Sequence, residues 1–171
     1  EGETPVPPPT GPAPVALGSA TFNAATSTYA LTPGLSQAGA AMSANRIDVR
    51  QSFTIGFDAF FGAADSGADG MAFVIHNDAS RLDALGGPGG ALGVDGIGNG
   101  LAIEFDTYQG DAPDIAADHT GFFDTDGTFS SAPVALANIE DGQWHAVRVM
   151  WDATLQRITY TLDGVLVGTL N

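Results

Sequence analysis

The chain has 171 residues, enough for one domain with a buried core, and a formal net charge of −15 that comes from 20 acidic side chains against five arginines and no lysine. This charge excludes a conventional nucleic-acid-binding surface, because no basic patch is present to displace counterions, and it favours divalent cations as partners. The absence of cysteine excludes disulfides, and no apolar run approaches the roughly 20 residues needed for membrane insertion.

Residues 1–16 contain six of the ten prolines. Proline fixes φ and lacks the backbone N–H donor, so this segment is predicted to be an extended, semi-rigid tether rather than a helix or a central strand. The alternative is a tail without a role. The predicted organisation is therefore a proline-rich tether over residues 1–16 and a single domain over residues 17–171.

From residue 19 onward, short apolar or alternating runs bounded by glycine and proline predict β-strands. The alternating run at 46–61 predicts one long strand with a break near Gln51, and the apolar run at 70–76 is typical of a strand covered on both faces. Asp163-Gly164 between two such runs predicts a type I′ hairpin. No stretch has a helical period of useful length, so the fold class is an all-β antiparallel sandwich. Besides the strand of the candidate site, the predicted strands span residues 19–22, 29–31, 38–43, 46–61, 70–76, 143–151, 157–162 and 165–170.

The stretch from residue 101 to 119 organises the candidate site. Its first half alternates, so Glu104, Asp106 and Tyr108 are predicted on one strand face and apolar residues on the other. A loop then adds Asp114 and His119. Oxygen ligands suit Ca²⁺, and one imidazole added to them suits a transition ion beside it. The alternative interpretation is a solvated acidic strand edge with a surface histidine.

Several other features have mainly structural interpretations. Both tryptophans are predicted to be core or sheet-face residues rather than ligand platforms, and His76 and His145 to be strand-end residues without acidic neighbours at ligand spacing. Residues 124–127 resemble part of a calcium loop but lack the glutamate at its twelfth position, so a turn is predicted. Eight glycines within residues 86–100 predict either a loop whose backbone amides approach a ligand closely or a flexible hairpin loop. A dinucleotide fingerprint is not indicated, because no βα unit follows.

Four motifs occur in one order along the chain: the run 53–61 that ends in an aromatic pair, the Ala68-Asp69-Gly70 region, the glycine loop that leads into Glu104-Phe105-Asp106-Thr107-Tyr108, and Asp114 and His119 followed by 141–145 and 162–164. Over roughly residues 19–171 the chain thereby resembles an L-type (legume-type) lectin domain of the kind also found in bacterial surface proteins. The resemblance implies a concanavalin A-like jelly-roll sandwich of antiparallel sheets. It also implies calcium-dependent, non-catalytic binding of glycans in adhesion, at the cell surface or outside the cell.

The resemblance further implies two sets of metal ligands. For Mn²⁺ or another transition ion, these are the side chains of Glu104, Asp106, Asp114 and His119. For Ca²⁺, they are Asp106, the Tyr108 carbonyl, Asp111 and Asp114. The family has an asparagine at the position of Gly110, so the neighbouring Asp111 is expected to take over its calcium role. As a carboxylate, Asp111 lacks the amide donor that a sugar oxygen would use.

The sugar-contacting residues that the resemblance implies are Asp69, Gly87, Gly89, Gly90, Tyr108 and Asp111. Asp69 would accept hydrogen bonds from two adjacent hydroxyls, the glycine amides would donate, and the Tyr108 ring would stack on a sugar face. In the family the peptide before this aspartate is cis, so a cis Ala68–Asp69 bond is expected. The alternative for Asp69 is a plain turn residue beside Gly70.

Two other functions share this fold class. A retaining glycosidase needs two carboxyl groups about 5 Å apart, but Gln109 stands where the second acid would follow Glu104 and Asp106, so the chain is predicted not to be an enzyme. A structural or filament-forming subunit with reduced or lost sugar binding is favoured by Gly110. The sequence ends at Asn171, before the family's C-terminal strand or strands, and three explanations stay open: the segment is not part of this sequence, a second chain supplies it, or a neighbouring subunit's strand completes the sheet.

Overall fold

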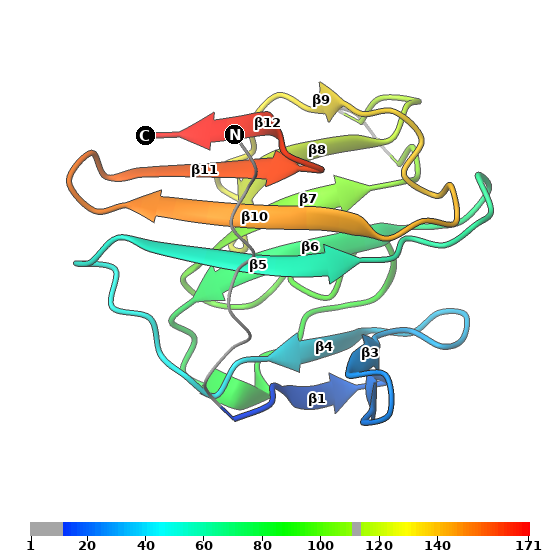
Figure 1. The fold of residues 1–171 in the computed structure, drawn as a ribbon, viewed down its shortest axis with the longest axis horizontal. Coiled ribbons are helices and arrows are strands. Elements are labelled where there is room, and N and C mark those ends of the chain that lie inside the picture. The colour runs from blue at the N-terminus through cyan, green and yellow to red at the C-terminus, as the bar shows by residue number, and fades with distance from the viewer. Residues whose placement is uncertain (1–11, 111–113) are drawn as a thin grey trace.

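The computed structural model describes residues 12–110 and 114–171, and within these ranges the protein is an antiparallel β-sandwich (Figure 1). The β7 sheet has the strand order β6 (Gly70–His76), β7 (Gly100–Asp106), β8 (His119–Asp124) and β9 (Val134–Ala135). The β10 sheet has the order β12 (Val165–Leu170), β11 (Arg157–Leu162), β10 (His145–Asp152) and β5 (Phe53–Ala59). The predicted all-β fold class is therefore confirmed.

Two small antiparallel pairs lie below the two sheets in Figure 1, formed by the N-terminal part of the described chain. β1 (Val15–Gly18) pairs with β4 (Gly39–Met42), and β2 (Thr21–Asn23) pairs with β3 (Thr28–Ala30). Two single-turn 3₁₀-helices, η1 (Arg81–Asp83) and η2 (Gly89–Ala91), are the helical elements of the described residues. None of them is long and apolar enough to cross a membrane.

The core between the two sheets is centred on Tyr160 of β11, which is fully buried. Its ring meets Phe105 and Phe122 edge-on, with centroids 6.0 and 5.1 Å apart, and its hydroxyl lies 2.8 Å from that of Thr120. Burial raises the pKa of Tyr160 to about 12. Gly168 of β12 passes so close to this ring that a Cβ there would collide with it. The predicted alternation of β7 is confirmed, since Phe105 faces this core.

A second, smaller core covers the opposite face of the β7 sheet. Ala84, which precedes the glycine-rich segment of residues 86–100, packs there against Ala102 of β7, together with Val94 and Ile97 of that segment. Thr125 donates a hydrogen bond to the Ile97 carbonyl and so fastens the segment to the end of β8. The glycine-rich segment is thus a loop packed against the β7 sheet, and the approach of its amides to a ligand stays a prediction.

The hairpin and most strands lie where the sequence predicts them. Asp163 and Gly164 both have positive φ, +50° and +79°, as a type I′ turn requires. The long strand predicted at 46–61 is wrong in its first half, because β5 begins only at Phe53 and Asp48 closes a local turn with the backbone N–H of Arg50 at 3.1 Å. The predicted domain boundary at residue 16 falls within β1, and residues 1–11 of the predicted tether lie outside the described residues.

Candidate metal centre and adjoining loops

The three groups that could hold a metal ion meet where β7 ends and β8 begins. Asp106, the last residue of β7, is the cross-strand partner of His119, the first residue of β8, and Asp114 comes from the loop between them. One ligand atom from each of the three lies within 4.8 Å of the others. Asp106 is 6% exposed and His119 only 1%. The structure therefore brings together three of the residues that the sequence predicts as metal ligands.

The orientation of His119 shows that these residues fit a metal ion. Its Nδ1 lies 3.1 Å from the Ala117 carbonyl, and since that oxygen can only accept, we assign the hydrogen to Nδ1. Nε2 then carries a lone pair, which is buried without a hydrogen-bond partner and lies 3.6 Å from Oδ1 of Asp114. A buried polar atom left without a partner is costly, and a cation among the two carboxylates would supply that partner.

Glu104 is the fourth predicted side-chain ligand and lies at the edge of this cluster. It faces Gly121 across the strand pair, and a Cβ on Gly121 would lie 2.9 Å from Oε1 of Glu104, so the missing side chain leaves room for the carboxylate. Burial raises the pKa of Glu104, and the charges of Asp106 and Asp114 raise it further, against an opposing effect of His119. Burial likewise raises the pKa of Asp106. A divalent cation would stabilise both carboxylates in their charged form.

The loop after β7 is tied back to the cluster by its own backbone. The Tyr108 N–H donates to Oδ1 of Asp106 at 2.8 Å, and the Gly110 N–H donates to Oδ2 of Asp114 at 3.1 Å. The Tyr108 ring is exposed, as expected of a ring available for stacking. Asp111, which was predicted to contact both calcium and sugar, lies outside the described residues.

Asp69 lies beside the cluster, at the start of β6. The Ala68–Asp69 peptide is cis, as predicted, and the Asp69 carbonyl accepts a hydrogen bond from the Thr107 N–H at 3.0 Å. Gly89 approaches from the glycine loop with φ +72°, and a Cβ there would lie 3.9 Å from Oδ2 of Asp69. Gly87 and Gly90 have no such contact with Asp69. The structure thus brings Gly89, of the three predicted glycines, to Asp69.

Sequence reasoning assigned no role at the site to residues 138–142, called here the 138–142 segment, which contact both loops of the candidate site. Asn138 donates to Oδ1 of Asp65 at 2.8 Å, and the Gly142 N–H donates to the Gly62 carbonyl at 2.8 Å, both within the stretch that leads to Asp69. The Ile139 N–H donates to Oδ2 of Asp118, which precedes His119, at 2.7 Å. No local motif signals these contacts, because they join positions 21 to 80 residues apart.

Glu140 fills the space between these contacts. It is 4% exposed, its Oε2 is buried without a hydrogen-bond partner, and a Cβ on Gly67 would collide with its Oε1. Burial raises the pKa of Glu140, and the charges of Asp118 and Asp65 raise it further. Gly67 is therefore required as a glycine by a buried side chain whose position could not be predicted from any local motif.

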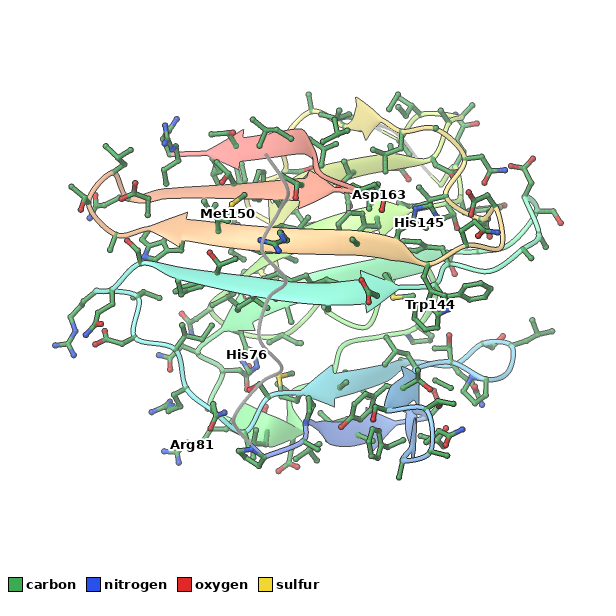
Figure 2. All side chains as sticks on the ribbon, in the orientation of Figure 1. His76, Arg81, Trp144, His145, Met150 and Asp163 are labelled. Atoms are coloured by element: carbon green, nitrogen blue, oxygen red, sulfur yellow. The ribbon has the colours of Figure 1, made fainter. Side chains whose placement is uncertain are left out.

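Two further sequence predictions at this end of the sandwich need correction. His145 is not free of acidic neighbours: its Nδ1 lies 2.8 Å from Oδ2 of Asp163 and its Nε2 lies 3.2 Å from Oδ1 of Asp141. Figure 2 shows His145 and Asp163 side by side. Of the two positions predicted for Trp144, the core or a sheet face, the core is wrong, because Trp144 is 57% exposed, with its ring centroid 5.5 Å from that of Phe60. Asp163 reaches His145 from 18 residues away in sequence, whereas Asp141 is four residues before it.

The remaining structural interpretations hold. His76 is a strand-end residue whose Nδ1 accepts from the Asp78 N–H at 3.2 Å. Trp151 packs against the main core and donates through Nε1 to the Val49 carbonyl at 2.7 Å. Asp124 accepts from the backbone N–H groups of Thr128 and Phe129, so residues 124–127 belong to a turn, as predicted.

Comparison with known proteins gives one family and a consistent fold. The model of the legume lectin beta-barrel domain matches residues 14–170. The pesticidal crystal protein Cry22Aa of Bacillus thuringiensis is 32% identical over 170 residues, which cover 85% of this chain and 23% of that protein. The L-type lectin-domain containing receptor kinase VIII.1 of Arabidopsis thaliana is 35% identical over 115 residues, which cover 61% of this chain and 16% of the kinase. The chain thus spans less than a quarter of either relative.

Solved structures agree on the fold. Basic winged bean lectin, crystallised with Tn-antigen, has a TM-score of 0.73 at 21% identity, over 91% of this chain and 72% of that lectin. Lectin II from Ulex europaeus has a TM-score of 0.69 at 22% identity, over 91% of this chain and 74% of that lectin. These likenesses confirm the predicted jelly-roll sandwich.

Proposed function

The chain belongs to the legume-type (L-type) lectin family, and on this premise we propose that it is a calcium-dependent, non-catalytic carbohydrate-binding module. The observation that supports the proposal most is the buried, unpartnered Nε2 of His119 beside Asp106 and Asp114, next to the loop that holds Asp69. A lone acidic strand edge would not need a buried imidazole with its lone pair among carboxylates.

Different residues of the chain would have different roles in binding. When bound, divalent ions would neutralise the acidic cluster and fix the loop that follows β7. The carboxylate of Asp69 accepts hydrogen bonds from two adjacent sugar hydroxyls, the backbone amide of Gly89 donates to a sugar oxygen, and the exposed Tyr108 ring stacks on an apolar sugar face. Glu104 and Asp106 serve the ions rather than acid–base chemistry.

The setting is proposed to be extracellular or at a cell surface, in adhesion. Calcium is abundant there, and a net charge of −15 suits binding of divalent cations. A single shallow sugar site gives weak affinity, so multivalent display would supply avidity. Pairing by a second chain also stays a prediction: β12 is the edge of the β10 sheet and exposes Val165 and Leu166.

A second candidate function is a structural subunit of the same fold with reduced or lost sugar binding. Gly110 favours it, because this position offers no side chain to a ligand. A Cβ there would lie 2.8 Å from Oδ2 of Asp114, so in this loop conformation an asparagine side chain would press on a metal-binding carboxylate.

A glycan array run with calcium, after chelation, and after calcium is restored separates the two candidates. We expect binding that is lost on chelation and recovered on restoration. Asp69→Asn should abolish it, whereas the matched control Asp58→Asn, an exposed residue of β5, should not. Binding that ignores chelation would refute the calcium dependence, and a folded protein that binds no glycan would favour the structural candidate.

A further inference from the structure

We propose that the ligand is an oligosaccharide whose inner residues lie in a groove on the outer face of the β7 sheet, beyond Asp69. The groove has a volume of about 360 Å³, within the roughly 300–1,000 Å³ range of ligand pockets. Its lining includes Gly90 and Asp95 from the glycine-rich segment, Glu104 and Phe123 from the sheet, and Phe129 from the turn after β8. This inference rests on the proposed function, because it places the first sugar at Asp69.

Two lining residues relate the groove to the candidate site. Gly90 follows Gly89, the residue that approaches Oδ2 of Asp69. Glu104 lines the groove and also belongs to the acidic cluster around His119. A chain of sugar residues that starts at Asp69 can therefore enter the groove without leaving the surface of the protein.

The turn that carries Phe129 is held rigidly by Asp124. Oδ1 of Asp124 accepts from the N–H groups of Thr128 at 2.7 Å and Phe129 at 3.0 Å, and the Asp124 N–H donates to the Phe129 carbonyl at 3.0 Å. A bridge between Phe123 and Ser130 continues this pairing. Phe129 is nevertheless 40% exposed, so its ring is presented to solvent on a preorganised turn, which lowers the entropic cost of binding.

The lining defines the chemical class of the ligand. It combines the Phe129 ring with the carboxylate of Asp95, while Glu104 stays assigned to the ions, and the lining residues that the structure describes include no lysine, arginine or histidine. Carboxylates accept hydrogen bonds from hydroxyls, and an aromatic ring packs on the C–H face of a pyranose. Anionic sugars would meet like charge. The groove is therefore suited to a neutral, hydroxyl-rich oligosaccharide.

Calorimetry with calcium tests this, using the methyl glycosides of galactose, mannose and glucose and the matching linear trisaccharides. We expect the trisaccharide of the bound sugar to bind about two- to tenfold more tightly than its methyl glycoside, the range that one aromatic contact supplies. Phe129→Ala should remove this gain and leave the methyl glycoside unchanged. Phe22→Ala, which truncates a similarly exposed ring of β2, should keep it.

The outcomes distinguish failure of the groove inference from failure of the proposed function. Equal affinity for both probes in the wild-type protein, or an equal loss for both in Phe129→Ala, would overturn the groove and leave the site at Asp69 intact. Failure of every probe to bind would overturn the proposed function and the groove with it. If Phe129→Ala fails to fold, Asp95→Asn, on an exposed residue, tests the same gain.

Discussion

Replacement of His119 by alanine tests the candidate metal centre separately from the rest of the fold. A ligand present at 100 times its Kd stabilises the native state by about 2.7 kcal/mol, and each kcal/mol shifts the Tm of a domain of this size by about 2–4 °C. Mn²⁺ should therefore raise the Tm of the wild-type protein by about 5–11 °C over its value in chelator. If loss of the imidazole weakens the site about 100-fold, the same Mn²⁺ concentration stabilises by only about 0.4 kcal/mol, a shift of about 1–2 °C.

The Tm of each variant is measured by thermal unfolding with Mn²⁺ and in chelator. The cavity left by the buried His119 ring lowers the Tm in both conditions, so it does not contribute to the shift that the metal causes. Because imidazole favours transition ions and the oxygen ligands of Asp106 and Asp114 remain, His119→Ala should respond to Ca²⁺ more than to Mn²⁺. His76→Ala, at a strand end, is the control and should keep the full response. A Mn²⁺ response in His119→Ala as large as in the wild type would refute the reasoning.

Three further predictions concern the surroundings of the centre. Burial alone would lower the pKa of His145, but Asp163 and Asp141 outweigh it and raise that pKa, so the stabilising contribution is complete below about pH 6.5 and disappears as pH rises through the raised value. The Tm difference between wild type and His145→Gln should accordingly shrink from pH 6 to pH 9, and a constant difference would contradict the pairing. Asn138→Ala removes hydrogen bonds to Asp65 and from the Glu140 N–H, so chemical denaturation should show a loss of about 1–2 kcal/mol, whereas an unchanged midpoint would argue against this role. Gly89→Ala should weaken monosaccharide binding in calorimetry, while Gly164→Ala, at a similar positive φ in open space, should lose stability only; equal affinities would exclude Gly89 from the site.

The local part of this structure could be predicted from the sequence. Alternation placed Phe105 in the core and Glu104 and Asp106 on the opposite face, and Asp163-Gly164 identified the hairpin. The same alternation failed at 46–52, where Ile47 and Val49 are exposed and no strand forms. Alternation predicts which face a side chain takes if a neighbouring strand pairs with it, and only the tertiary fold supplies that neighbour.

The candidate site, too, could be predicted from the sequence only in part. The spacing of Asp106, Asp114 and His119 could indicate a metal centre because the end of one strand, the loop after it and the first residue of the next strand carry all three. The environment of His145 could not be predicted, because Asp163 reaches it across a strand pair. Trp144 could not be placed either, since its exposure depends on what the fold leaves uncovered rather than on its own sequence neighbours.

The 138–142 segment connects the candidate metal centre to the loop that carries Asp69. It binds Asp118, whose neighbour His119 enters the metal centre, and it binds Asp65 and the Gly62 carbonyl in the stretch that leads to Asp69. Buried Glu140 occupies the space against Gly67, so the two loops cannot shift independently without opening a gap around a buried carboxylate. If a bound metal ion orders the loop before His119 and thereby favours one position of Asp69, the coupling is reciprocal, and a bound sugar is expected to tighten the metal site by the same factor.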